Sequence, residues 1–290
     1  TRGSVPFMTE LSNLTRKFVN GVRNLPMGLN DMGGMTVKDL QEAKGKRTIA
    51  YVQVARKEEA IAASEAGMDM IGTAFVPERS HFAKTVPNTH FQFGLPWGKH
   101  ADATEALRDA MGAMMAGAQS VYCGYSPQIV ESLAREGIPV ICHVGLVPPK
   151  ATWTGGFKAV GKTLEQAKMI WTQVQEFERA GAFAVEMEVV AAGLAAEITK
   201  RTSMLTISLG SGVGCDAQYL FSADLLGENR GHIPRHAKTY RNFAAERDRL
   251  QHERVAAYRE YIADVTNGEF PNANQVVNID DETLAKVWET

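Results

Sequence analysis

The feature that most constrains the fold is a regular alternation between short apolar segments and longer amphipathic segments along most of the chain. The short segments are rich in Val, Ile and Phe, which is typical of buried strands. The longer segments carry apolar residues at helical spacing, and several begin at Thr, Asp or Pro and end at Gly. Because strands that are joined through helices lie parallel, this order predicts a parallel sheet covered by helices.

The expected elements follow from this pattern. Strands are predicted at Arg47–Val54, Met68–Phe75, His90–Leu95, Ser120–Tyr125, Pro139–Leu146, Phe183–Val190 and Met204–Leu209. Helices are predicted at Arg56–Ala66, Asp102–Met115, Pro127–Arg135, Thr163–Ala180 and Ala191–Arg201. A final short strand or helix is expected near Gln218–Leu226. So many strand–helix units in one compact stretch favour a closed (β/α)8 TIM barrel. The open doubly wound alternative predicts a glycine-rich phosphate loop after the first strand, and Val54–Lys57 is not such a loop.

The barrel is expected to span about residues 47–226, as the core of a single domain that comprises the whole chain, 1–290. A polar N-terminal arm precedes it, and a helical extension of about residues 235–290 follows it. Within the extension, Asn242–Glu269 combines many charges with apolar residues at helical spacing. We therefore expect a C-terminal helix outside the barrel, lying against either the barrel itself or a neighbouring subunit.

Composition excludes several classes of function. The 290 residues are 44% hydrophobic and 22% charged, with a formal net charge of −2 and no run rich in Lys or Arg. A nucleic-acid partner is therefore not expected, and no apolar stretch approaches the roughly 18 residues that span a bilayer. Thr1–Phe7 lacks the pattern of a signal peptide. Cys123, Cys142 and Cys215 have no metal-ligand spacing and are expected in the core, as in a cytoplasmic protein.

Candidate catalytic residues lie where the predicted strands end, because parallel barrels place their active sites at that face. Glu186 and Glu188 alternate on one strand, so both point to the same side of the sheet. A buried carboxylate with a raised pKa is a suitable base for a proton beside a carbonyl, and His143 can donate to that carbonyl. The glycine-rich segment 148–162 after His143 resembles a lid. The alternatives are a structural histidine and a solvated or ion-paired carboxylate pair.

A glycine-rich turn, Leu209–Gly214, follows the strand predicted at Met204–Leu209. Its backbone NH groups could hold an anionic group of a substrate. The turn matches a dinucleotide-binding loop poorly, and an ordinary tight turn is the competing interpretation. Asp216, just beyond it, is either a functional carboxylate or a turn residue.

Several ordered motifs resemble those of the ketopantoate hydroxymethyltransferase family. The family's HxGLxPQ and GGYKxQGK motifs correspond to HVGLVP at His143–Pro148 and GGFKAVGK at Gly155–Lys162. Its AGAxxxxLExVP strand is similar to AGAFAVEMEVV at Ala180–Val190. Further counterparts are ISLGSG at Ile207–Gly212, CDAQ at Cys215–Gln218, GHIPRHAK at Gly231–Lys238 and NGEFP at Asn267–Pro271. The similarity is good from about Pro139 to Pro271 and extends faintly back to about Thr36, so it covers most of the chain.

The resemblance implies a (β/α)8 barrel of the phosphoenolpyruvate mutase and isocitrate lyase superfamily, assembled as a large homo-oligomer such as a decamer. It also implies transfer of a one-carbon unit from methylenetetrahydrofolate to an enolised 2-oxo acid, with Mg²⁺ holding the enolate. By motif position, Glu188 corresponds to the general base and His143 to a substrate-contacting histidine. Further residues near the strand ends are candidate substrate contacts, namely Thr73, Trp97, Tyr122, Lys158, Ser208 and Gly210.

The metal-binding part of the family pattern is missing from this sequence. Where the family has VGDS, Ile71–Val76 holds no carboxylate, and the aspartate of ADLPF falls at Gly94. The lysine and glutamate of VKxEGG have no counterpart in Val121–Tyr125. Since Mg²⁺ needs carboxylate ligands, no Mg²⁺ site of the family's kind is expected. The aromatic residues nearby, which predict a pocket for a larger or less charged ligand, are Phe75, Phe93, Trp97 and Tyr122. The expected ligands of any bound metal, a set that favours Zn²⁺, are His90, His143, Glu186 and Glu188.

The sequence therefore predicts an enzyme that makes or breaks a C–C bond on a carbonyl or 2-oxo acid substrate, with hydroxymethyl transfer as the leading case. Two alternatives stay open. The same barrel could support a different lyase, a hydrolase or an isomerase, because a fold does not fix a chemistry. The missing metal carboxylates would also suit a non-catalytic binding or assembly subunit, whereas Glu188, His143 and the lid-like segment favour catalysis.

Overall fold

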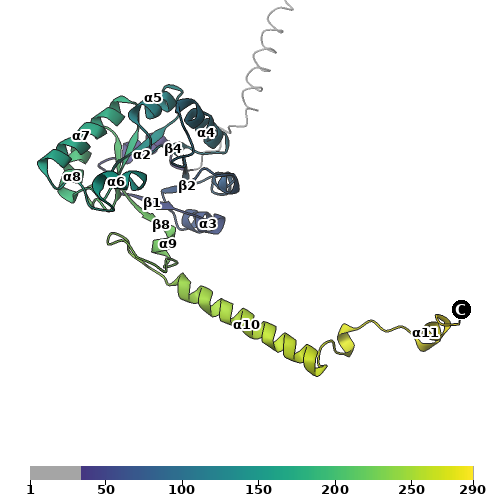
Figure 1. Ribbon diagram of the computed structural model, residues 1–290. Coiled ribbons are helices and arrows are strands. Elements are labelled where there is room, and N and C mark those ends of the chain that lie inside the picture. Colours follow the sequence, from purple (N-terminus) through teal and green to yellow (C-terminus); the bar gives the residue numbers. More distant parts are fainter. Residues whose placement is uncertain (1–33, 290) are drawn as a thin grey trace, which may run out of the picture.

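The computed structural model describes residues 34–289, and in them eight parallel strands close into a barrel in which β8 pairs with β1 (Figure 1). The strands are β1 (Ile49–Gln53), β2 (Met70–Ala74), β3 (His90–Gly94), β4 (Ser120–Tyr122), β5 (Val140–Gly145), β6 (Ala184–Glu188), β7 (Leu205–Leu209) and β8 (Ala217–Phe221). The predicted (β/α)8 barrel is confirmed, and each strand predicted before residue 210 contains an observed strand.

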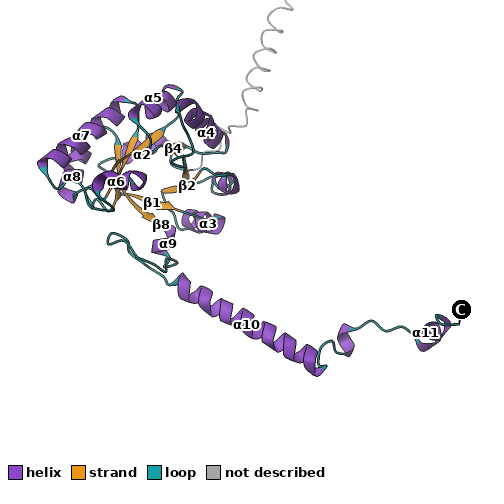
Figure 2. Cartoon of the chain, viewed as in Figure 1, coloured by secondary structure: helices purple, strands orange, loops and turns teal. Residues whose placement is uncertain are grey.

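Helices cover the outside of the barrel (Figure 2). They are α2 (Val37–Ala43), α3 (Lys57–Glu65), α4 (Ala103–Met115), α5 (Pro127–Arg135), α7 (Leu164–Arg179) and α8 (Ala192–Arg201). Two predicted helix starts hold in detail, because the side chains of Asp102 and Thr163 accept hydrogen bonds from NH groups in the first turns of α4 and α7. The stretch Gln218–Leu226, which was predicted to be either a strand or a helix, contains parts of both, because β8 leads directly into α9 (Ser222–Leu225). Short 3-10 turns, Pro77–Arg79 and Ala83–Thr85, lie between β2 and β3.

Alternation along the strands divides the barrel side chains into two sets. Outward-pointing residues such as Ile71 and Val185 pack under the helices, and the lower interior of the barrel is filled by apolar residues such as Ile49. Phe93 belongs to the outer set, and Phe75 packs against it with the two ring centroids 5.2 Å apart. The prediction that these two aromatic rings line a ligand pocket is therefore wrong, because both lie on the helix side of the sheet.

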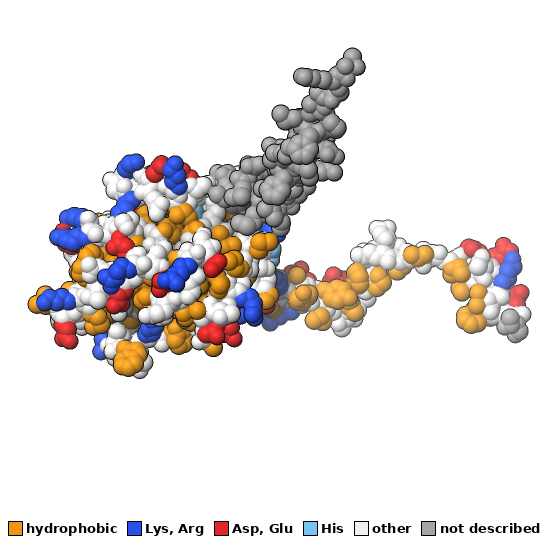
Figure 3. Space-filling model, turned by 90° about the horizontal axis from the view of Figure 1, so that it is seen from above, with side chains coloured by type: hydrophobic (Ala, Val, Ile, Leu, Met, Phe, Trp, Pro, Cys, Tyr) orange, Lys and Arg blue, Asp and Glu red, His pale blue; other side chains and the backbone are white. Residues whose placement is uncertain are grey.

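The helix α10 (Phe243–Asn267) projects away from the barrel, and apolar side chains are visible along this C-terminal segment (Figures 1 and 3). None of its residues is buried in the described part of the chain. The alternative in which this helix lies against its own barrel is therefore wrong, and its placement against a neighbouring subunit stays a prediction. The turn Ala273–Gln275 and the helix α11 (Asp281–Lys286) follow it. Most of the predicted N-terminal arm lies outside the described residues.

Two expectations drawn from composition can be compared with the structure. All three cysteines are free and buried, as expected for core residues. Burial raises the pKa of the Cys123 and Cys142 thiols, so both stay protonated and are poor nucleophiles. Among the described helices, none is both long enough and apolar enough to cross a membrane.

Candidate active site

A cavity of about 240 Å³ opens at the C-terminal ends of the strands, where parallel barrels place their active sites. One wall is formed by His143 on β5 and by Glu186 and Glu188 on β6. The rest of the lining includes tyrosine and glutamine side chains from β1, β3, β4 and β8, namely Tyr51, Gln53, Gln92, Tyr122 and Tyr219. The structure thus brings together the histidine and the two glutamates that were predicted from their strand-end positions, while their roles remain predictions.

The pairing of β5 with β6 sets the position of these side chains. His143 pairs with Glu186, and Gly145 pairs with Glu188. Gly145 has a φ of 95°, and a Cβ atom there would lie 2.4 Å from the Glu188 carbonyl oxygen, so this position requires glycine. Val189 has a φ of 51°, a rare conformation for a β-branched residue. Hydrogen bonds of its backbone to two neighbouring segments hold this conformation, which fixes where the Glu188 side chain leaves the strand.

His143 is held in one tautomer by its surroundings. Burial lowers the pKa of His143 to about 4, so the imidazole is neutral at neutral pH. Its Nδ1 atom lies 2.6 Å from the hydroxyl oxygen of Tyr122. Burial raises the pKa of Tyr122 well above its usual value, so this hydroxyl keeps its proton and donates to Nδ1. The ring proton is then on Nε2, which lies 3.4 Å from Oε2 of Glu188 and has no hydrogen-bond partner among the described residues. Nε2 is therefore free to donate to a ligand.

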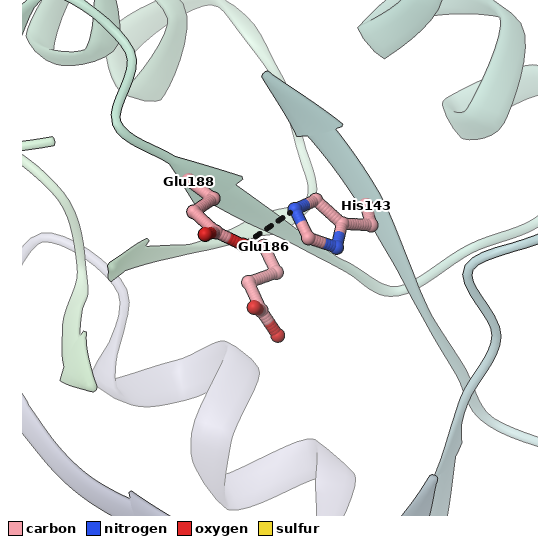
Figure 4. Close-up of side chains that lie close together, drawn as sticks. All are labelled: His143, Glu186 and Glu188. Carbon is pink, nitrogen blue, oxygen red and sulfur yellow. Dashed lines mark ion pairs between the residues drawn. The ribbon is translucent and has the colours of Figure 1, made fainter. Parts of the chain in front are cut away.

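The two glutamates are buried without a lysine or arginine partner in the described part of the chain. Burial raises the pKa of Glu188 to about 7. Burial and the nearby charge of Glu188 raise the pKa of Glu186 to about 8. Figure 4 shows that Glu188 and His143 face each other, while the side chain of Glu186 extends away from both. The alternative of a solvated carboxylate pair is therefore wrong.

The raised pKa of Glu186 makes the stability of the fold depend on pH. A buried carboxyl with a pKa of about 8 holds a proton that the unfolded chain, with the usual value of 4.5, releases earlier. Its contribution to the free energy of unfolding is thus fully present below about pH 4.5 and is lost as the pH rises to about 8. We expect Glu186→Gln to remove this decline, which amounts to at most about 1.4 kcal/mol per pH unit.

Urea unfolding at several pH values between 5 and 8 measures this effect. The wild type and the variant are compared at each pH, so the opposite contributions of His90 and His143, whose pKa values burial lowers to about 4, cancel. Parallel curves for the two proteins would show that Glu186 is ionised in the folded state throughout this range.

Donor atoms of His143, Glu186 and Glu188 lie within 4.8 Å of one another, a spacing that allows a metal ion among them. The further predicted ligand, His90, is not part of this group. It begins β3 at the opposite face of the barrel, where its ring nitrogens are hydrogen-bonded to the Met35 carbonyl and the Ser120 hydroxyl. The prediction for His90 is wrong because the first residue of a barrel strand lies away from the active-site face.

Of the predicted substrate contacts, Thr73 and Tyr122 line the cavity. The Thr73 hydroxyl also serves the fold, since it donates to the Val54 carbonyl oxygen at 2.8 Å and accepts a hydrogen bond from Arg79 at 3.3 Å. Tyr122 contributes the hydroxyl that orients His143.

The structure does not bring the other four predicted contacts into the cavity. Trp97 is 54% exposed, and Lys158 lies exposed on the loop before α7. Ser208 is buried and accepts a hydrogen bond from the backbone NH of Ser211, because its side chain points to the outside of β7. Gly210 has a φ of 75° and lies against the ring of His236. The prediction that these four residues contact a ligand in the cavity is therefore wrong.

The lid-like segment borders the mouth of the cavity. Pro148 and Pro149 line it directly, and the short helix α6 (Ala151–Thr154) follows them. Trp153 and Phe157 on this segment are 90% and 76% exposed. Large apolar side chains are therefore available beside the mouth to cover a bound ligand.

The glycine-rich turn Leu209–Gly214 packs against α8. Cβ atoms at Gly212 and Gly214 would lie 2.8 Å and 2.5 Å from the Cβ atoms of Ala192 and Ala196. Glycine is needed there because the turn approaches the helix closely. The ordinary-turn interpretation is therefore confirmed, and the turn does not face the cavity.

Asp216 is a structural carboxylate. It is buried at the N-terminal side of β8, where one carboxylate oxygen accepts hydrogen bonds from the Lys44 ammonium group and from the NH and hydroxyl groups of Thr206, at 2.8 to 2.9 Å. Its functional alternative is wrong, since it lies outside the cavity.

Apart from Tyr122, sequence reasoning missed the tyrosine and glutamine side chains that line the cavity, namely Tyr51, Gln53, Gln92 and Tyr219. Tyr51 is hydrogen-bonded to Gln92, and Tyr219 is hydrogen-bonded to Gln53. The rings of Tyr51 and Tyr219 are stacked, with centroids 4.3 Å apart and an interplanar angle of 14°. A signal was present, because Tyr51 and Gln53 alternate within an otherwise apolar strand and so share its inward face.

The family model of ketopantoate hydroxymethyltransferase matches residues 73–273 of this chain. The chain belongs to this family. The 3-methyl-2-oxobutanoate hydroxymethyltransferase of Deinococcus radiodurans is 35% identical over 233 residues, which cover 77% of this chain and 79% of that protein. The enzyme of the same name from Kosmotoga olearia is 32% identical over 266 residues, which cover 83% of this chain and 97% of that protein. The resemblance carried by the motifs is thus confirmed.

Among solved structures, oxaloacetate acetylhydrolase in complex with the inhibitor 3,3-difluorooxalacetate is similar to this chain, with a TM-score of 0.53. The similarity covers 83% of this chain and 98% of that chain at 12% sequence identity. At such low identity it shows the barrel fold alone.

The wall where the ketopantoate hydroxymethyltransferase motifs carry metal carboxylates has none in this chain. β2 and β3 end in Thr73-Ala74 and Gly94. At Gly72 an added Cβ atom would lie 2.4 Å from the hydroxyl oxygen of Tyr51 and 2.5 Å from Oε1 of Gln92, so the room for a larger side chain is filled. The hydroxyl and amide groups of this wall therefore do not hold Mg²⁺ in the manner of the family's motifs, and no step below is assigned to that ion.

Proposed function

We propose that this chain catalyses hydroxymethyl transfer, or a closely related C–C bond-forming or bond-breaking step, on a carbonyl compound in the cavity. The observation that carries the proposal is the position of Glu188, a largely buried carboxylate that faces Nε2 of His143 on the adjacent strand. Both residues lie in segments that match the family's motifs. The names of the relatives, which are transferases, support the same class of reaction.

In this proposal Glu188 removes a proton from the carbon next to the carbonyl, and Nε2–H of His143 donates a hydrogen bond to the carbonyl oxygen. The negative charge that develops on this oxygen is stabilised by a donor already in place, which needs no reorganisation. Water releases the one-carbon unit from methylenetetrahydrofolate as formaldehyde, which breaks both of its C–N bonds and leaves tetrahydrofolate. The carbon then adds to formaldehyde, whose C=O π bond breaks, and the resulting alkoxide takes the proton held by Glu188 to become the new hydroxyl group. A pKa of about 7 for Glu188 lets it accept and return a proton near neutral pH.

We propose methylenetetrahydrofolate, the donor that the family resemblance implies, as a co-substrate. A cavity of about 240 Å³ suits a small carbonyl compound, so a folate would reach it from the open mouth beside Pro148. A metal ion held by His143, Glu186 and Glu188 is a separate possibility for the same space, and a binding titration with Zn²⁺ addresses it.

Proton exchange in D2O tests the proposal without requiring the full reaction. A panel of 2-oxo acids, ketones and amides is incubated with the protein, with and without formaldehyde and EDTA, and exchange at the carbon beside the carbonyl is followed by NMR. At least one compound is expected to exchange faster than with buffer alone. Absence of exchange and of product across the panel would favour the non-catalytic alternative.

We also propose that the chain forms a homo-oligomer through α10. Tyr258, Tyr261, Ile262 and Val265 are exposed and follow helical spacing along one side of this helix, none of whose residues is buried in the described part of the chain. The wild type is expected to give a mass well above 31.7 kDa in sedimentation experiments at micromolar concentration. The double variant Tyr258→Glu, Ile262→Glu is expected to lower this mass, and Glu260→Gln on the same helix is the control. A monomeric wild type would refute this proposal.

A further inference from the structure

The deep end of the cavity contains a carboxyl group that has no basic partner and that ionises when a cation binds beside it. Glu186 is 5% exposed and makes no hydrogen bond or ion pair with any described residue. A buried carboxylate of this kind is costly unless it binds a proton or a cation. Nε2 of His143, on the same wall, is also buried and without a hydrogen-bond partner in the described part of the chain. A hydrogen-bond donor and a carboxyl group therefore face the same cavity, and both can contact a ligand there.

The groups around Glu186 favour a positively charged ligand. No lysine or arginine is among the described residues that line the cavity. Tyr51, Tyr122 and Tyr219 surround the Glu186 carboxylate closely enough for its charge to raise the pKa of each phenol. A carboxyl group among tyrosine hydroxyls forms a site that suits an ammonium group, because the carboxylate attracts its positive charge and the oxygen atoms of all these groups can accept its hydrogen bonds.

The nearest basic residues lie outside the cavity. Arg79 donates a hydrogen bond to the outward-pointing hydroxyl of Thr73. Lys150 is exposed on the segment after β5, close enough for its charge to lower the pKa of His143. Neither residue lines the deep end, so a substrate carboxylate placed there would meet Glu186 without any compensating charge.

We propose that the substrate of this chain is a carbonyl compound that carries a protonated amino group, and that Glu186 binds this group at the floor of the cavity. The inference rests on the proposed function, in which Glu188 and His143 act on the carbonyl. It assigns to Glu186 a separate role in choosing the substrate. The 2-oxo acid of the family carries a carboxylate where this substrate carries the amino group. In this chain Glu186 recognises the substrate, and Glu188 transfers the proton.

A metal ion is the other cation that would suit this wall. Donor atoms of His143, Glu186 and Glu188 lie within 4.8 Å of one another, so the spacing admits an ion. Such an ion would take all three residues as ligands, whereas an ammonium group needs only Glu186 and the tyrosine hydroxyls and leaves Glu188 and His143 for the carbonyl. Metal binding is therefore treated as a competing outcome.

Three probes of one shape test the inference by calorimetry on the full chain. They are the anion 3-methyl-2-oxobutanoate, the neutral 3-methyl-2-oxobutanamide and the cation 1-amino-3-methylbutan-2-one, each titrated with EDTA and again with added Zn²⁺. The cation is expected to bind the wild type at least tenfold more tightly than the amide, and the anion more weakly than both. Glu186→Gln is expected to weaken binding of the cation by about ten- to a hundredfold, and binding of the amide by less than about threefold.

The order of the three affinities is measured on the wild type, so it tests the inference even if the Glu186→Gln variant does not fold. Anion binding equal to or tighter than cation binding, or no detectable binding of the cation, would overturn the inference. Preferential anion binding that appears only with Zn²⁺ would overturn it in favour of a metal site. Proton exchange at the carbon beside the carbonyl reports separately on the proposed function, so a cation that binds without exchange would reject that function and leave the charge preference intact.

Discussion

Replacing Glu188 by Gln is expected to lower the rate of proton exchange beside the carbonyl by about 10²–10⁴-fold, the usual contribution of a general base. The substitution removes the basic oxygen and keeps the size of the side chain. Glu188 is not a member of the hydrophobic core, so the fold should be retained. The measurement is the NMR exchange rate with a compound selected from the panel, and circular dichroism verifies the fold.

The pH profile of the wild type provides a second readout of the same role. Since the ionised form of Glu188 is the base and its pKa is about 7, the exchange rate should rise with pH up to about 7 and then level off. Glu253→Gln, an exposed position on α10, is the matched control and should exchange at the wild-type rate. Full activity of Glu188→Gln would return Glu188 to a structural role.

Asp216→Ala is expected to lower the free energy of unfolding by about 3 kcal/mol, because it removes the acceptor shared by a buried charge pair and by neighbouring hydrogen bonds. The side chain of Asp216 is 3% exposed and that of Lys44 is 22% exposed. The variant leaves this ammonium group and the Thr206 NH and hydroxyl groups without their acceptor. Urea unfolding at pH 7 measures the loss.

The control for Asp216 is Asp248→Ala, since Asp248 forms an ion pair with Arg230 in which both side chains are more than half exposed. Such a surface pair contributes less than about 1 kcal/mol. A loss at Asp216 no larger than at Asp248 would contradict the structural role. The folded fraction of Asp216→Ala should bind cavity ligands as the wild type does, because Asp216 does not line the cavity.

The barrel could be predicted from the sequence because its strands are apolar on both faces over most of their length, and its helices carry clear start and stop signals. His143 and Glu188 could be found because a strand end locates a residue at the active-site face. The barrel and the C-terminal helix could both be predicted because each depends only on the local pattern of apolar and polar residues.

The remaining errors arose where the direction of a side chain mattered. Phe93 and Ser208 lie near the C-terminal ends of their strands, as predicted, but their side chains point to the helices and not into the barrel. Neighbouring residues of a strand point to opposite faces of the sheet, so an error of one residue reverses the predicted direction. His90 was correctly predicted as the first residue of its strand, and that position lies away from the active-site face, so naming it as a metal ligand was the error. Tyr51 and Tyr219 stack although they lie far apart in sequence, and only closure of the barrel between β8 and β1 brings them together.

The close fit around Gly72 couples three positions on neighbouring strands. Any side chain larger than hydrogen there would collide with Tyr51 and Gln92, which are hydrogen-bonded to each other. A larger residue at position 72 can therefore be accommodated only if Tyr51 or Gln92 changes as well. Mutagenesis that aims to reshape this cavity is thus expected to succeed when the three positions are varied together and to fail when position 72 is varied alone.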